Sequence, residues 1–350
     1  MNERTFLEFF CGGGMERIGL GDSWRCLFAN DIDPKKGSAY AANFGRDHLM
    51  VCDVAKLTIA DLPHERVDLV WLGAPCVGHS EAGNRQGFDE KQSGAFWPAW
   101  SLIEQLAAEG RAPRLVVLEN VTGLLHRSGA LGVVQTAFAS AGYRHAHAVI
   151  DAAHFVAQSR QRLFVIGSLG ADPAPFLADA MRSLPKRNHG LVDVLDLESE
   201  DCAWEFSPAE VQRHLLMMDE TNVARVAAAR ALEYPIAGPF ARRMRDVPGP
   251  KKRIQRLEVR FDGLANALRC ANGGGSSKQF VMIINSGQTR MRAIQPREAA
   301  RVMGLPDDYR LPAKPVDALS LLGDGVVVPV VRHLAERVLE PLLVTEGALA

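Results

Sequence analysis

Short apolar runs alternate with helical stretches from Thr5 to about Gly170, and this alternation constrains the fold more than any other feature of the chain. The runs at 67–72 and 115–118 are continuous, as is typical of strands buried on both faces of a parallel sheet. Because strands alternate with helices, the pattern predicts an α/β fold with a doubly wound, mostly parallel sheet. A chain of 350 residues, 47% of them hydrophobic, can build one large domain and a smaller one.

The regular alternation stops near residue 170, which predicts a second domain. The stretch 171–285 contains Pro-rich breaks, a helical patch at 207–216 and a strand-like run at 280–284. From 286 onward the chain is expected to return to the first domain and to end in a helix over about 326–339 that packs on the sheet. The predicted domains are therefore 1–170, 171–285, and a return segment, 286–350, that completes the first domain.

The opening of the chain indicates a ligand site. An apolar strand runs into three glycines and then a helix over residues 6–20, so that the backbone can approach a nucleotide-like ligand closely. Asp31 follows the next apolar run and suits a pair of ribose hydroxyls, and Asp53 follows a third, where an adenine amino group could be read. Three glycines alone mark only a turn, but the repeated acids at strand ends favour cofactor binding.

Cys76 and Glu119 each follow an apolar run, 67–72 and 115–118. Open α/β sheets bind their ligands at the carboxyl ends of the strands, so a nucleophilic thiol and an acid are expected to share one cleft. Each residue also has an ordinary structural interpretation. A lone cysteine is more often a small buried apolar residue, and a glutamate at that position often caps the segment that follows.

These elements form a series of motifs that resembles the DNA cytosine-5 methyltransferases over nearly the whole chain, in the family's order. The stretch 8–15 resembles the cofactor loop, Asp31 and Ile32 the ribose and adenine contacts, and Asp53 the reader of the adenine amino group. The remaining motifs are the Pro-Cys nucleophile at 75–76, the acid motif at 119–121, the paired arginines at 158–162, and structural motifs at 292–298, 304–308 and 323–326.

The resemblance implies a fold of the S-adenosylmethionine-dependent methyltransferase type, in which 171–285 is the target-recognition domain. It assigns cofactor binding to eight residues: Phe10, Gly12, Gly14, Asp31, Ile32, Asp53, Pro75 and Asp324. The Cys76 thiolate would attack carbon 6 of cytosine, Glu119 would stabilise the charge in the ring, and Arg160 and Arg162 would orient the base. Because a stacked base hides its reactive face, the target cytosine must be flipped out of the duplex.

Some positions depart from the family pattern. Val77, Gly78 and His79 replace a Gln, a variable residue and an aromatic or large apolar residue, while Ser80 is retained. Val77 offers none of the amide hydrogen bonds expected of that Gln. Four further substitutions leave every reacting group in place: Glu8 and Asp324 for a common Asp and Asn, Met15 for a Gly, and Gln295 for a Thr.

The net charge of −1 excludes a protein that coats nucleic acid without specificity, so DNA binding must depend on a local basic patch. Eight basic residues lie between 242 and 260, and a solvated loop is the alternative interpretation of that run. The Gly-rich turn at 272–277 suits a loop that approaches DNA closely. The predicted DNA contacts are Ser80, Arg243, Lys251, Lys252, Arg256 and Gly274.

Six cysteines without a Cys-x-x-Cys pair argue against a zinc site and a disulfide framework, so no metal is expected. The chain shows no signal peptide and no apolar run of membrane-spanning length, which predicts a cytoplasmic protein. Together with the resemblance, this predicts a bacterial or phage-type enzyme, acting as a monomer and nucleoid-associated when bound to duplex DNA. The resemblance also implies a restriction-modification setting, with a restriction endonuclease as a candidate partner.

Three alternatives stay open. An RNA cytosine methyltransferase acting on transfer RNA would use much the same groups, because the cytosine ring is identical. A catalytically weakened DNA-binding relative is favoured by the altered residues 77–79. A small-molecule dehydrogenase shares the strand-glycine-helix opening, but has no use for Cys76 together with Glu119.

Overall fold

The computed structural model describes residues 3–75, 95–126, 129–199, 204–246, 253–270 and 278–347. Five predicted site residues lie outside these ranges: Cys76, Ser80, Lys251, Lys252 and Gly274. The chain forms two compact units. The first comprises Met1–His154, Gln161–Lys186 and Gly325–Ala350, and the second comprises Phe155–Arg160 and Arg187–Asp324.

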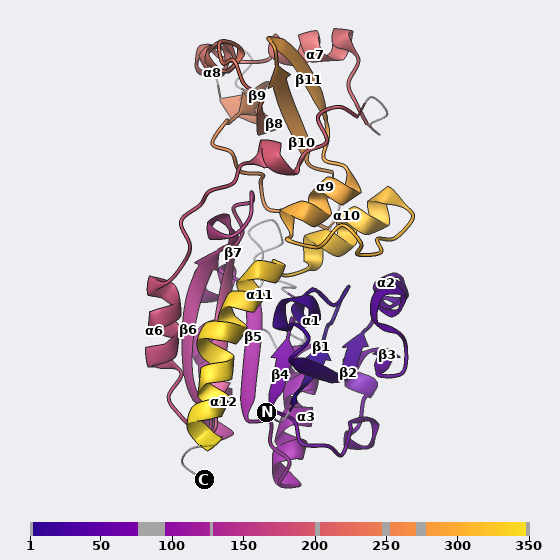
Figure 1. The fold of residues 1–350 in the computed structure, drawn as a ribbon, viewed down its shortest axis with the longest axis vertical. Helices are drawn as coiled ribbons and strands as arrows, with labels where there is room; N and C mark the ends of the chain where they lie inside the picture. Colours follow the sequence, from indigo (N-terminus) through magenta and orange to yellow (C-terminus); the bar gives the residue numbers. More distant parts are fainter. Residues whose placement is uncertain are drawn as a thin grey trace. The chain divides into compact units, whose positions relative to one another are not determined.

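The first unit contains a seven-stranded sheet in the order β3-β2-β1-β4-β5-β7-β6 (Figure 1). Only β7 runs antiparallel to its neighbours β5 and β6, so the predicted mostly parallel α/β sheet is confirmed. The strands are β1 (Arg4–Phe9), β2 (Trp24–Asp31), β3 (Leu49–Val51), β4 (Leu69–Leu72), β5 (Leu115–Val121), β6 (Arg144–Asp151) and β7 (Gln161–Ser168).

Helices follow the strands because the chain must return across the sheet between parallel neighbours. They are α1 (Met15–Leu20), α2 (Pro34–Phe44), α3 (Phe96–Ala108), α4 (Gly123–His126), α5 (Ala130–Ser140) and α6 (Ala174–Arg182), with short 3₁₀ turns at Val54–Lys56, Ile59–Asp61 and Ala152–His154. Alternate residues of β1, β4, β5 and β7 form one core with α3 and α5, in which Trp100 stacks on Phe138 at 4.8 Å between ring centroids.

The C-terminal helix consists of α11 (Val328–Leu334), a π-helical turn (Ala335–Leu339) and α12 (Glu340–Gly347). Pro341 explains the π turn, because a proline inside an α-helix lacks its N–H and clashes with the carbonyl four residues earlier. The helix continues beyond the predicted end at 339. The stretch Pro315–Thr345 is apolar and long enough to cross a membrane, but 72% of an 18-residue apolar portion of it is buried in the protein, as is usual for core helices.

The second unit is built on a four-stranded antiparallel sheet in the order β11-β10-β8-β9. Its strands are β8 (Ile236–Asp246), β9 (Arg253–Val259), β10 (Phe280–Asn285) and β11 (Gln288–Ala293). Its helices are α7 (Pro208–Leu215), α8 (Glu220–Arg230), α9 (Pro296–Val302) and α10 (Pro315–Asp324), with a 3₁₀ turn at Leu191–Val194. The predicted helix at 207–216 and strand at 280–284 are confirmed.

The second unit extends past residue 285 because the chain stays paired there. β11 forms a hairpin with β10, and the buried Arg292 guanidinium binds the Glu298 carboxylate of α9 at 2.6 Å. Removal of either partner would leave a buried charge unpaired. The compact units therefore do not follow the boundaries at 170 and 285, and the division into catalytic and recognition domains stays a prediction.

Candidate active site

The loop between β1 and α1 has an unusual backbone. Phe10, Gly12 and Gly14 have φ values of 62°, 52° and 74°, in the left-handed region. A Cβ on Gly14 would lie 2.4 Å from Cε2 of Phe44, so this glycine is required by its close contact with α2. A Cβ on Gly12 would meet no atom of the described residues within 4 Å, so among them this part of the loop leaves room for a ligand to approach the backbone.

Asp31 ties the glycine loop to the second strand. It is the last residue of β2, one position further into the strand than predicted, and its carboxylate accepts hydrogen bonds from the Gly12 N–H at 2.9 Å and the Asp33 N–H at 2.8 Å. Burial raises the pKa of Asp31. The side chain of Ile32 is 65% exposed, which is unusual for a large apolar residue beside a buried carboxylate and suits contact with a flat ligand.

Asp53 follows β3 and caps a 3₁₀ turn. Its Oδ1 accepts a hydrogen bond from the Ala55 N–H at 3.0 Å. The neighbouring Asn30 side chain was not predicted as part of the site. It donates to the carbonyls of Met50 and Cys52 at 2.9 and 3.0 Å, and thereby holds the end of β3 against β2. Its place at the end of an apolar run, beside Asp31, is the signal that could have identified it.

Glu119 lies inside β5, opposite Phe164 of β7, and this corrects the prediction that it follows the strand. The strand continues to Val121 because β7 pairs with it along its whole length. Arg162 of β7 binds Glu119, with 3.1 Å between Nε and Oε1, and the two side chains are 19% and 13% exposed. The structure therefore brings the predicted acid and one predicted arginine into direct contact.

Asn120 connects this pair to the segment that leads to the predicted nucleophile. Its Nδ2 donates to the Ala74 carbonyl at 3.3 Å, and the Gly73 N–H donates to the Phe9 carbonyl at 3.2 Å. Pro75, the last described residue before Cys76, is exposed. The segment 73–75 is thus fixed between the end of β1 on one side and β5 on the other.

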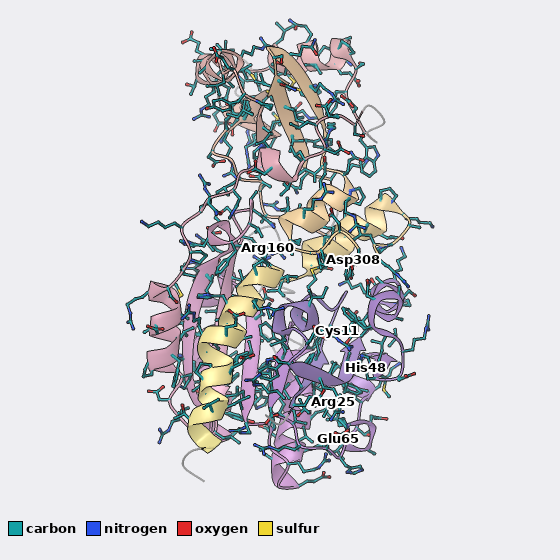
Figure 2. The ribbon with its side chains drawn as sticks, viewed as in Figure 1. Cys11, Arg25, His48, Glu65, Arg160 and Asp308 are labelled. Carbon is teal, nitrogen blue, oxygen red and sulfur yellow. The ribbon has the colours of Figure 1, made fainter. Side chains whose placement is uncertain are left out.

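Two buried carboxyl groups flank the glycine loop in the sequence, Glu8 in β1 and Glu16 in α1. Glu8 is fully buried, and neither of its carboxyl oxygens has a hydrogen-bond partner of standard geometry among the described residues. Burial raises the pKa of Glu8 well above its usual range, and the nearby Glu16 carboxylate raises it further. Burial likewise raises the pKa of Glu16 to about 7. Next in the chain, Arg17 donates to Nε2 of His48 at 2.6 Å (His48 and the loop residue Cys11 are labelled in Figure 2).

We expect Glu16→Gln to stabilise the protein above pH 7. Folded Glu16 keeps its proton up to about pH 7, whereas in the unfolded chain it loses it near 4.5. The unfolded state therefore binds fewer protons in this window, and wild-type stability falls as the pH rises. The variant lacks this loss, so its advantage should grow from pH 4.5 to 7 and reach on the order of 1–3 kcal/mol. Urea unfolding across that range measures it, with the exposed Glu233→Gln as control; equal pH profiles for both variants would contradict the buried acid.

Arg160 has a different environment from Arg162. It belongs to the second unit, is 3% exposed, and donates from Nη1 to the Leu268 carbonyl at 2.8 Å and from Nη2 to the Gly323 carbonyl at 2.9 Å (Figure 2). Asp324 is the last residue of α10 and also belongs to the second unit. The two arginines that were predicted to act together therefore belong to different units, Arg160 to the second and Arg162 to the first.

The basic segment forms the β8–β9 ribbon of the second unit. Arg243 lies directly opposite Arg256, and such like-charged pairs across two strands are unfavourable without a counter-charge. Glu258 lies 3.6 Å from Arg243 and also accepts a hydrogen bond from Arg245 at 2.8 Å. Asp246, which lies 3.4 Å from Arg253, is the only other acid of these two strands. The strands together carry five arginines, so the ribbon has a surplus of positive charge.

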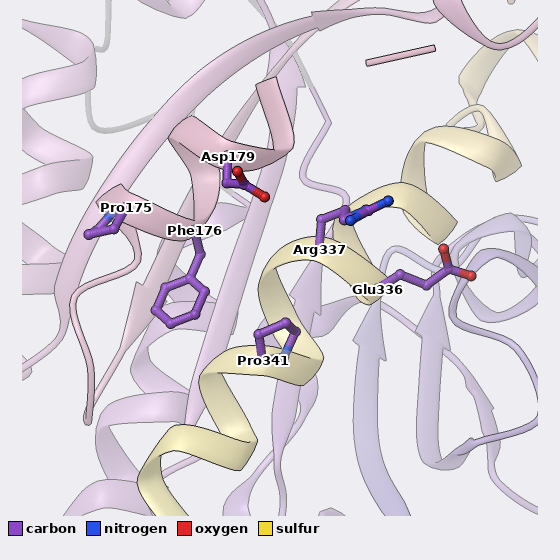
Figure 3. Close-up of a pocket in the computed structure, with 6 residues that line it drawn as sticks. All are labelled: Pro175, Phe176, Asp179, Glu336, Arg337 and Pro341. Atoms are coloured by element: carbon purple, nitrogen blue, oxygen red, sulfur yellow. The ribbon is translucent and has the colours of Figure 1, made fainter. Parts of the chain in front are cut away.

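An open hollow lies between α6 and the C-terminal helix and does not coincide with this site. It is lined by six residues: Pro175, Phe176, Asp179, Glu336, Arg337 and Pro341 (Figure 3). None of the predicted site residues contributes to it. Within the described ranges, no group of three His, Cys, Asp or Glu side chains could hold a metal ion, and the expected lack of a metal stays a prediction.

Comparisons with known proteins identify the family of the chain. The family model of the C-5 cytosine-specific DNA methylases matches residues 4–340. The Type II methyltransferase M.NlaX of Neisseria lactamica is 26% identical over 352 residues, covering 95% of each chain. M.HpaII of Haemophilus parainfluenzae is 25% identical, covering 97% of this chain and 90% of that protein.

Solved structures show the same fold. The Dnmt2 methyltransferase of S. pombe superposes with a TM-score of 0.67 at 17% identity, covering 97% of this chain and 99% of that one. The Entamoeba histolytica methyltransferase EhMeth gives 0.64 at 13% identity, covering 98% and 99%. Since the family model spans nearly the whole chain, the protein belongs to the C-5 cytosine-specific DNA methylases.

Proposed function

We propose that the protein transfers a methyl group from S-adenosylmethionine to carbon 5 of a flipped-out cytosine in a specific duplex DNA site, through a covalent Cys76 adduct. The contact between Glu119 and Arg162 in neighbouring strands carries this proposal. It places an acid and a fixed guanidinium on the β5–β7 side of segment 73–75, directly before Cys76. The curated relatives named Type II methyltransferases make a restriction-modification setting, with a partner endonuclease, part of the proposal.

The proposed chemistry starts at the cytosine ring. Carbon 5 is a poor nucleophile until the Cys76 thiolate adds to carbon 6 and pushes electron density toward it. Glu119, hydrogen-bonded to ring nitrogen 3 and the exocyclic amine, stabilises the charge that moves into the ring. Arg162 holds the Glu119 carboxyl and offers its remaining N–H groups to the base. Once carbon 5 carries the methyl group that the bound cofactor would supply, with S-adenosylhomocysteine as the leaving group, loss of the proton on carbon 5 expels the Cys76 thiolate and restores the ring.

The first unit has features that fit S-adenosylmethionine, which supplies an electrophilic methyl group when bound. The open side of Gly12, the buried Asp31 carboxylate and the exposed Ile32 form a backbone cradle, an acceptor for ribose hydroxyls and an apolar surface for adenine. Phe10, Gly14, Asp53 and Pro75 complete the proposed site, and Asp324 of the second unit is assigned to it by the resemblance alone.

We expect Asp31→Ala to weaken S-adenosylmethionine binding by about 1.5–3 kcal/mol, because hydrogen bonds to a charged group are lost. The variant also loses the acceptor for the Gly12 N–H, which orders the loop. Calorimetric titration measures the affinity, and Asp33→Ala, which removes only the cap of α2, is the control. An unchanged affinity in Asp31→Ala would place the cofactor elsewhere.

DNA binding is proposed to use the β8–β9 ribbon for phosphates, through Arg243 and Arg256 and the adjoining Lys251 and Lys252. Ser80 and Gly274 are proposed contacts near the flipped base and the target site. The charge surplus of the ribbon supports its part in this proposal, because phosphates relieve the repulsion between the facing arginines.

We expect the double variant Arg243→Ala, Arg256→Ala to bind all duplexes more weakly while keeping its sequence preference. Each lost phosphate contact should reduce the slope of log K against log salt by about 0.9, so the expected change is about 1.8. Fluorescence anisotropy over a range of salt concentrations measures it, with the exposed Arg182→Ala of α6 as control. An unchanged slope together with a changed methylation site would contradict the assignment.

Parallel reactions of labelled S-adenosylmethionine with duplex DNA and with transfer RNA identify which nucleic acid is the substrate. We expect label in 5-methylcytosine of DNA only, and bisulfite sequencing of that DNA then identifies the site. Label in transfer RNA would favour the RNA methyltransferase. Binding to DNA without transfer of label would favour the catalytically weakened relative.

A further inference from the structure

Two buried side chains of the segment Phe155–Arg160 hold the same distant residue. Oε1 of Gln158 accepts a hydrogen bond from the Leu268 N–H at 2.8 Å, and Arg160 donates to the Leu268 carbonyl at 2.8 Å. Gln158 is fully buried and Arg160 is 3% exposed. Leu268 lies outside any strand, so its buried main-chain groups depend on these side chains for hydrogen bonds.

The main chain strengthens the same contact. The Ser159 N–H donates to the Ala265 carbonyl at 3.2 Å, and the Ala265 N–H donates to the Ala157 carbonyl at 2.8 Å. The segment 264–268 is therefore bound to 157–160 by both main-chain and side-chain hydrogen bonds. All of these residues belong to the second unit.

A second polar atom of each side chain donates a hydrogen bond to a main-chain carbonyl in or near α9 and α10 of the same unit. Nε2 of Gln158 donates to the Val302 carbonyl at 3.3 Å, and Nη2 of Arg160 donates to the Gly323 carbonyl at 2.9 Å. Gly323 also packs against residues 269–270, because a Cβ there would lie 2.3 Å from the Arg269 carbonyl carbon. A glycine is thus needed where the chain after Leu268 crosses the end of α10.

We propose that Gln158 and Arg160 are positioning residues that fix segment 264–270 and thereby determine which DNA site is methylated, and that Arg160 does not touch the target base. This inference rests on the proposed function. Both terminal nitrogens of Arg160 donate to buried main-chain carbonyls, whereas Arg162 is the arginine that binds Glu119. Segment 264–270 follows β9 of the basic ribbon and precedes β10 of the same sheet, so its placement controls how the recognition strands are connected.

The test uses the full-length protein and the site found by bisulfite sequencing. The variants are Gln158→Leu, Arg160→Met and the double variant. For each, we measure kcat, KM for DNA and the affinity for S-adenosylmethionine. We also measure its selectivity, the ratio of the methylation rate at the true site to the rate at sites that differ from it by one base. Each single variant should lower that ratio about tenfold. A tenfold change corresponds to about 1.4 kcal/mol, which is the usual cost of one mismatched base pair in a recognised site. The double variant should be no worse than the poorer single one, because both side chains hold Leu268. The kcat at saturating DNA and the cofactor affinity should stay within about twofold.

A fall in kcat for Arg160→Met as large as that of Arg162→Met, with KM and selectivity unchanged, would overturn the inference. So would additive effects of Gln158→Leu and Arg160→Met. The exposed neighbour Gln161→Ala serves as control. If Arg160→Met fails to fold, Arg160→Lys is measured instead, because it keeps one donor group. This variant should show an intermediate loss of selectivity, and unchanged selectivity would refute the inference. Failure of the proposed function is distinguishable, since wild-type protein would then not methylate cytosine in DNA.

Discussion

Replacing Cys76 by alanine is expected to abolish methyl transfer to DNA while leaving the affinity for S-adenosylmethionine nearly unchanged. The thiolate acts only on the base, and loss of a covalent nucleophile typically lowers kcat by about 10⁴-fold or more. Single-turnover transfer of labelled methyl groups measures the rate, and calorimetry measures cofactor binding. Cys52→Ala, at a half-buried cysteine in the turn after β3, is the control and should retain activity. Normal turnover by Cys76→Ala would exclude the proposed mechanism.

Replacing Glu119 by glutamine is expected to lower kcat by about 10²–10⁴-fold, the usual contribution of a positioned acid or base. The variant keeps the size of the side chain but has no carboxyl group to bind both ring nitrogen 3 and the Arg162 guanidinium. Cofactor affinity should not change. The surface pair of Arg25 and Glu65 provides the matched control, because Glu65→Gln breaks a carboxylate–arginine contact of 2.6 Å at an exposed position (Figure 2).

A kcat for Glu119→Gln within about threefold of wild type would contradict its role, since a general acid contributes far more than that. An equal loss in Glu65→Gln would show that the effect is one of stability. Thermal unfolding of both variants separates these outcomes, because exposed ion pairs contribute only about 0–1 kcal/mol.

The sheet and the strand-end acids could be predicted because they follow from local patterns. Continuous apolar runs mark buried parallel strands, and Asp31, Asp53 and Glu119 lie at or near the carboxyl ends of such runs. The extension of β5 past Glu119 could not be predicted from the run itself. It depends on pairing with β7, a strand more than 40 residues away in the sequence.

The partners of the two arginines could not be predicted either. Arg160 and Arg162 are two residues apart, which says nothing of the distant carbonyls and carboxylate that they bind. The buried pair of Glu8 and Glu16 was likewise missed, since only the packing of α1 on the sheet shows that both carboxyls are excluded from water. Tertiary contacts, not local patterns, decide these roles.

The central claim is a covalent bond between Cys76 and carbon 6 of the target cytosine. A duplex with 5-fluorocytosine at the methylated site tests it most directly, because fluorine replaces the proton that must leave before Cys76 is released. Incubation with S-adenosylmethionine should give a stable protein–DNA complex that resists denaturation, and peptide mass spectrometry should locate the bond at Cys76. Full activity on ordinary DNA with no such complex, or a complex linked through another residue, would contradict the account.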